Sequence, residues 1–119
     1  MQNIPDKNIV VALTFLARNM HTIEAAHGFL TPVPENLLPM FKGNKIALMH
    51  SELSEALEAV RKPRQDDHCP MFSNEVVELA DCVIRVLSYC YHFNLPLADA
   101  ILAKAEFNRS RPFMHGKLS

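Results

Sequence analysis

Two pairs of acidic residues have the types and the spacing that could do chemistry: Glu52 with Glu55, and Glu78 with Asp81. The members of each pair are three residues apart, and residues with this spacing lie on one face of a helix. Each pair therefore directs two carboxylates to one point. Carboxylates in apolar surroundings repel one another and are costly to desolvate, so they need a proton, a basic partner or a bound cation.

A bound cation is the favoured partner, because no Lys or Arg stands between the members of either pair. Oxygen-only ligands suit Mg²⁺ or Mn²⁺ best. We therefore expect a magnesium site, with manganese as a possible substitute, and phosphate chemistry. The predicted ligands and catalytic residues are Glu52, Glu55, Glu78 and Asp81, one of which, or else Glu75, takes the proton of the attacking water. The competing interpretation of the first pair is a solvated acidic stripe, since helix surfaces are rich in Glu.

Composition bounds the class of protein. A chain of 119 residues predicts a single domain over 1–119, and its 49% hydrophobic and 21% charged residues are ordinary for a globular protein. A net charge of −1 argues against general nucleic-acid binding and against binding to anionic membranes. Three cysteines without a CxxC pair indicate reduced thiols in a cytoplasmic protein. We expect neither a secretory signal nor a membrane span.

Helical periodicity accounts for the first half of the chain. Apolar residues at helical spacing predict a first helix over Ile9–Ala26, which Gly28 ends. The Pro-rich segment Phe29–Pro39 is expected to be a loop or a short irregular segment. A second helix is predicted over Lys42–Lys62, because Pro63 disfavours a helical residue before it.

Two further helices are predicted in the second half. Ser73 is a suitable N-cap for a third helix that runs to about Phe93. Pro96 suits the first turn of a fourth helix that ends near Arg109, followed by a short basic tail over 110–119. The prediction is an all-α four-helix up-and-down bundle. The third helix is apolar almost all round, which favours a homodimer or homotetramer whose sites are completed across the interface.

Basic and polar residues gather near the C-terminus and are candidates for substrate binding. Lys104, Asn108 and Arg111 share one face if the fourth helix continues, and that face could meet a triphosphate. Charge alone equally suits a solvated helix end that favours its own dipole. The full set of substrate-binding candidates is Lys104, Asn108, Arg111, His115, Lys117 and His50, the last because it directly precedes Ser51 and Glu52 and could face the site.

Four blocks of the sequence resemble the MazG-like nucleotide pyrophosphohydrolases, an all-α family. These blocks are 26–29 (AHGF), 45–58 (KIALMHSELSEALE), 78–87 (ELADCVIRVL) and 104–117 (KAEFNRSRPFMHGK). Their order and spacing resemble the family's turn after the first helix, its two metal-binding helices and its nucleotide-binding C-terminal stretch. The resemblance implies Mg²⁺-dependent hydrolysis of a nucleoside triphosphate, with a deoxynucleotide as the first expectation, to the monophosphate and pyrophosphate. It also implies a role in nucleotide-pool control or house-cleaning.

Two other classes compete with this interpretation. A carboxylate-bridged di-iron bundle needs Glu-x-x-His motifs, and Glu24 with His27 supplies one near a helix end. A non-catalytic helical interaction module would use the apolar third helix for assembly. Nucleic-acid binding through the basic tail is the weakest alternative, because the net charge is near zero.

Overall fold

Helices make up every regular element in the part of the chain that the computed structural model describes, residues 6–28 and 32–111, apart from one isolated β-bridge between Gln65 and Ser73. The elements in chain order are α1 (Asp6–Ala26), the short 3-10 helix η1 (Glu35–Leu37), α2 (Leu38–Arg61), α3 (Asn74–His92) and α4 (Leu97–Arg109). The predicted all-α class with four α-helices is confirmed.

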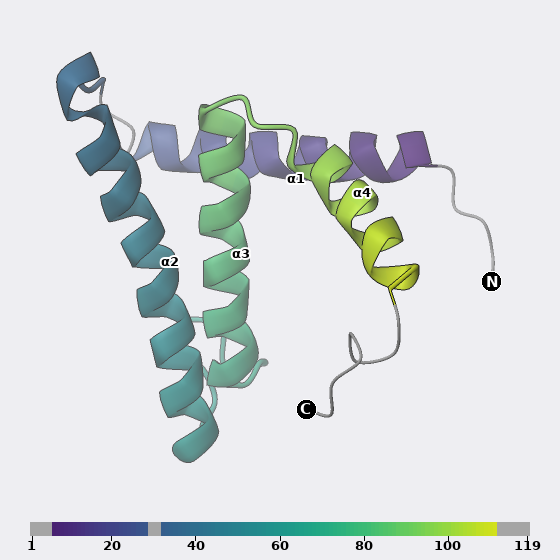
Figure 1. The fold of residues 1–119 in the computed structure, drawn as a ribbon. Helices are drawn as coiled ribbons and strands as arrows, with labels where there is room; N and C mark the ends of the chain where they lie inside the picture. Colours follow the sequence, from purple (N-terminus) through teal and green to yellow (C-terminus); the bar gives the residue numbers. More distant parts are fainter. Residues whose placement is uncertain (1–5, 29–31, 112–119) are drawn as a thin grey trace.

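The helices α2 and α3 form the centre of the arrangement and run antiparallel, side by side (Figure 1). Helix α1 packs across α3, at the end of the pair where α2 begins and α3 finishes. Helix α4 packs against α1 and leads away from it (Figure 1). The long shared face of α2 and α3 is therefore the place where residues of the two acidic helices meet.

Local sequence signals explain the helix ends. The Ser73 hydroxyl accepts a hydrogen bond from the backbone N–H of Val76, as expected of an N-cap. Gly28 adopts a φ of 77°, which glycine tolerates beyond the end of α1. Helix α2 begins four residues earlier than predicted, because Pro39 lies in its first turn, where a missing N–H leaves no helical hydrogen bond unmade. The predicted loop therefore ends before η1, and the part of it over 29–31 lies outside the described residues.

Small side chains form the buried core of the described residues. Ala17, Ala56, Ala59 and Ala98 are buried together with Leu87. Larger apolar side chains stay exposed, and α2 carries a stripe of them at helical spacing, each between 42% and 58% exposed: Ile46, Leu53, Leu57 and Val60. The radius of gyration is 17.1 Å, against about 13.5 Å for a compact chain of this length.

None of the described helices contains a stretch that is both long and apolar enough to cross a bilayer.

Candidate functional site

The two acidic pairs meet on the shared face of α2 and α3. Oxygen atoms of Glu52, Glu55 and Glu78 all lie within 4.8 Å of one another. Asp81 lies close enough to Glu52 for its negative charge to raise the pKa of the Glu52 carboxyl. The structure thus brings together all four predicted ligands, because the antiparallel register sets the second pair opposite the first. We call these four residues the carboxylate cluster.

Glu78 has the most perturbed environment of the cluster. Its pKa is raised to about 7, first by desolvation, then by the proximity of the Glu55 carboxylate and by the other negative charges around it. One of its oxygens, Oε2, is buried without a hydrogen-bond partner. A buried carboxylate oxygen without a donor is costly, so this atom is suited to a proton or a cation.

Glu52 is perturbed in the same direction. Desolvation raises its pKa, and the charge of Asp81 raises it further, while Arg85 acts in the opposite sense. The guanidinium Nη2 of Arg85 lies 3.7 Å from Glu52 Oε1, and the Arg85 side chain is about one-third exposed. The sequence interpretation gave Arg85 no role, although a residue four positions after Asp81 lies on the same helical face.

The arrangement can hold a divalent cation. Three or four carboxylates directed at one point supply oxygen ligands and enough negative charge to offset two positive charges. Without a cation, the charge of these groups is reduced by bound protons or offset by Arg85. The pKa values of Glu52 and Glu78 are raised accordingly, so both carboxyls take up a proton more readily than usual. Within the described residues this is the one group of three or more candidate ligands, and Glu24 and His27 of the di-iron alternative are not part of it.

A groove opens beside the cluster, toward the connection between α2 and α3. Its volume is about 350 Å³. Its lining includes Glu55 and Glu78 of the cluster and the two cations Lys62 and Arg64. Sequence reasoning gave these two cations no role: Lys62 was predicted only as the last residue of the second helix, and Arg64 lies just beyond it. The signal that could have found them is their place directly after the helix that carries the first acidic pair.

The predicted substrate-binding residues near the C-terminus lie elsewhere: Lys104 and Asn108 are on α4, and Arg111 follows two residues after the helix ends at Arg109. Lys104 and Arg111 both lie over the ring of Phe107, at 4.6 Å and 5.2 Å from its centroid, and Arg111 donates a hydrogen bond to the side-chain oxygen of Asn108. Helix α4 packs against α1 and stands apart from the α2–α3 pair (Figure 1). Within one chain, the structure therefore groups these residues with each other and not with the carboxylates.

The remaining predicted substrate-binding residues do not join the cluster either. His50 is exposed and precedes Glu52 by two residues, a step of about 200° around the helix, so it lies on the opposite side of α2. The expectation that it faces the site is corrected accordingly. His115 and Lys117 lie outside the described residues, as does Phe29.

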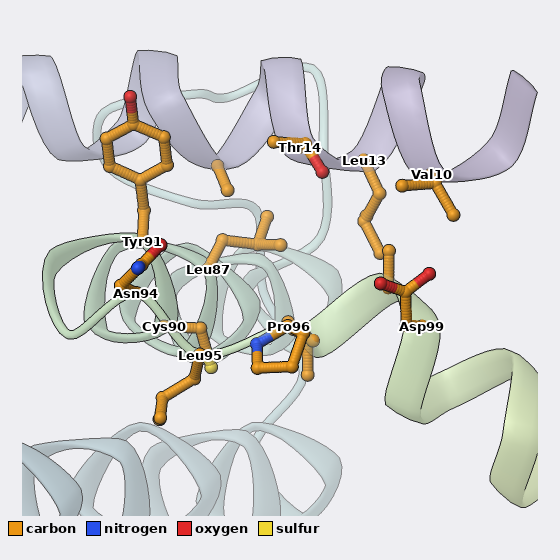
Figure 2. Close-up of a pocket in the computed structure, with 13 residues that line it drawn as sticks. Val10, Leu13, Thr14, Leu87, Cys90, Tyr91, Asn94, Leu95, Pro96 and Asp99 are labelled. Atoms are coloured by element: carbon orange, nitrogen blue, oxygen red, sulfur yellow. The ribbon is translucent and has the colours of Figure 1, made fainter. Parts of the chain in front are cut away.

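A second pocket lies between α1, α3 and the start of α4 (Figure 2). Its volume is about 190 Å³, and its lining is mostly apolar, with Leu13, Leu87 and Pro96 among the contributors. None of the four acidic residues lines it. It is a gap at the junction of three helices whose closest-packed residues are small, and it has no place in the chemistry of the cluster.

Comparison of the chain with models of protein families, with curated proteins and with solved structures finds no match. Function has therefore to be inferred from the residues and their geometry.

Proposed function

We propose that the protein is a Mg²⁺-dependent nucleoside triphosphate pyrophosphohydrolase, which hydrolyses a triphosphate, by preference a deoxynucleotide, to the monophosphate and pyrophosphate. The observation that carries the proposal is the meeting of two carboxylate pairs from antiparallel helices at one partly buried point. The resemblance of four sequence blocks to the MazG-like family supports the same reaction.

Each residue of the cluster has a part in this chemistry. Glu52, Glu55, Glu78 and Asp81 would hold Mg²⁺, or Mn²⁺ in its place, through carboxylate oxygens. Bound Mg²⁺ would neutralise charge on the phosphoryl oxygens and make a coordinated water more acidic. A carboxylate of the cluster that is not fully engaged then accepts the proton of the attacking water. A general base is most effective when its pKa is near the working pH.

The nucleotide-binding residues of α4 require a second copy of the chain. Helix α4, which carries Lys104 and Asn108, packs against α1 and stands apart from the α2–α3 pair, so we propose a homodimer or homotetramer in which α4 of one copy approaches the cluster of another. The exposed apolar stripe on α2 and the large radius of gyration support assembly, because a monomer would leave this surface in water.

The experiment that tests the reaction is pyrophosphate release from a panel of NTPs and dNTPs, with and without Mg²⁺. We expect Mg²⁺-dependent formation of pyrophosphate and monophosphate, and a loss of about 10²-fold or more in Glu55→Gln, which removes a charge from the metal site. Glu35→Gln is the control, since Glu35 is an exposed residue of η1.

No turnover of any nucleotide by the folded protein with Mg²⁺ present would overturn the proposal. The exposed apolar surface of α2 and α3 would then favour the non-catalytic interaction module, in which the carboxylates serve assembly or stability only.

A further inference from the structure

The groove beside the carboxylate cluster is lined by both acidic and basic side chains. Glu55 and Glu78 belong to the cluster, and Lys62 and Arg64 are cations. The remaining lining residues are Glu58, Ala59 and Asn74. Among the described residues, no aromatic side chain lines the groove, so none of them offers a ring there for a nucleobase to stack on. The groove is suited to the anionic part of a ligand that also carries a metal ion.

Hydrogen bonds with Asn74 hold the backbone of Lys62 and Arg64 in place. Asn74 is buried, and its side-chain oxygen accepts a hydrogen bond from the backbone N–H of Arg64. The side-chain nitrogen of Asn74 lies 3.5 Å from the carbonyl oxygen of Lys62. The backbone N–H of Asn74 donates a hydrogen bond to the carbonyl oxygen of Arg64. One side chain at the start of α3 thus fixes the chain on both sides of Pro63.

The loop that follows is built in the same way. The carboxylate of Asp66 is buried and accepts hydrogen bonds from the backbone N–H groups of His68 and Cys69, and the backbone N–H of Asp66 donates to Phe72. These hydrogen bonds join the two ends of the loop over residues 66–72 and fix its backbone. Arg64 is therefore presented at the groove from a fixed position rather than from a free segment.

The ion pairs that Lys62 and Arg64 form in this structure are weak, so both side chains can exchange their partner for a ligand. Lys62 lies 3.6 Å from Glu58, and Arg64 lies 3.0 Å from Asp67, and in both pairs each side chain is more than half exposed. Exposed ion pairs of this kind contribute little to stability. A phosphate group can replace the carboxylate at either cation, with Arg64 able to donate two parallel hydrogen bonds.

We propose that Lys62 and Arg64 bind the terminal phosphates of the substrate, the part that leaves as pyrophosphate. This inference rests on the proposed pyrophosphohydrolase function and names the residues that receive its leaving group. Lys62 follows Glu55 by seven positions, about 10 Å along a helix, so a phosphate held at the cluster would extend toward these cations. The carboxylates would hold the metal, and Lys62 and Arg64 would donate hydrogen bonds to the free phosphate oxygens.

The test is direct binding of inorganic pyrophosphate with Mg²⁺, measured by calorimetry, together with inhibition of turnover by pyrophosphate. We expect Lys62→Met and Arg64→Met each to weaken pyrophosphate binding about tenfold or more, because each removes charge-assisted hydrogen bonds. The pyrophosphate affinity of Arg64→Lys should lie between those of the wild type and Arg64→Met, since lysine keeps the charge and loses the bidentate geometry. Inhibition by the monophosphate should stay unchanged in all three variants.

Arg61→Met is the matched control, because Arg61 forms an exposed ion pair with the same Glu58 and does not line the groove. Circular dichroism of each variant verifies the fold. Equal pyrophosphate binding by the wild type, Lys62→Met and Arg64→Met would overturn the inference, even if nucleotide turnover is present. Absence of turnover with selective loss of pyrophosphate binding in these variants would instead overturn the enzymatic proposal and leave the anion site standing.

Discussion

Carboxyl oxygens of Glu55 and Glu78 lie within 4.8 Å of each other across the interface between α2 and α3. Burial disfavours the charged form of Glu78, and the negative charge of Glu55 so close to it adds to that cost, so the pKa of Glu78 is raised to about 7 and the metal-free cluster can hold a proton near neutral pH. A divalent cation at the same point would compete with that proton. The charge state of this pair therefore couples pH, metal binding and stability.

The stability of the metal-free protein should decrease as pH rises through the range in which Glu78 loses its proton. The folded pKa of Glu78 is about 7, above its ordinary value of 4.5, so between these values the folded state binds more protons than the unfolded state. The stabilising contribution of Glu78 is thus fully present below pH 4.5 and lost as pH rises through 7. Urea unfolding in EDTA should show Glu78→Gln more stable than the wild type at pH 8. Parallel pH profiles of the two proteins would contradict this account.

Magnesium should stabilise the folded protein at pH 8 and do so less at pH 5. At a Mg²⁺ concentration 100 times the dissociation constant, the gain is about 2.7 kcal/mol, which thermal unfolding records as a rise of several degrees. The rise should vanish in Glu52→Gln and Glu55→Gln and persist in Glu35→Gln. Titration in buffers of different ionisation enthalpy should also show proton release on binding, since the cation displaces a carboxyl proton.

Arg85→Met should destabilise the metal-free protein and enlarge the effect of Mg²⁺. The Arg85 guanidinium lies 3.7 Å from Glu52 and offsets part of the cluster's negative charge, so its loss should cost about 1 kcal/mol. Because Arg85 and a metal ion neutralise the same carboxylates, the variant should gain more free energy of unfolding from Mg²⁺ than the wild type. An equal gain in both proteins would indicate that Arg85 and the metal act independently.

Leu57→Glu should break the proposed assembly. Leu57 is 58% exposed and belongs to the apolar stripe on α2, and a charge there would be desolvated in an interface. Ala47→Glu is the control, because Ala47 is an exposed residue of the same helix that lies outside the stripe. Sedimentation equilibrium should give an oligomer for the wild type and Ala47→Glu, and a smaller species for Leu57→Glu. A monomeric wild type would contradict the proposed assembly.

Asn74→Ala should loosen the groove and reduce stability. The substitution leaves the backbone N–H of Arg64 without its acceptor, at a cost of about 1–3 kcal/mol. The corresponding change at Asn19, an exposed residue of α1, should have little effect. Chemical unfolding of both variants makes the comparison, and hydrogen exchange at Arg64 shows whether the loop has opened.

The sequence by itself determined the helices and the acidic faces. Both depend on interactions within a few residues: the N-cap at Ser73, the positive φ at Gly28, and the spacing of three that puts Glu52 beside Glu55. The same local rule, applied to a step of two residues, would have placed His50 on the far side of α2.

The tertiary structure alone decided which faces meet. The antiparallel register of α2 and α3 sets Glu55 opposite Glu78, and α4 packs on α1 rather than beside the cluster. Lys62 and Arg64 enter the site only because Asn74, ten residues beyond Arg64, holds the connecting loop. Such placements depend on the packing of whole helices and on hydrogen bonds between distant residues, and helical periodicity carries no information about either.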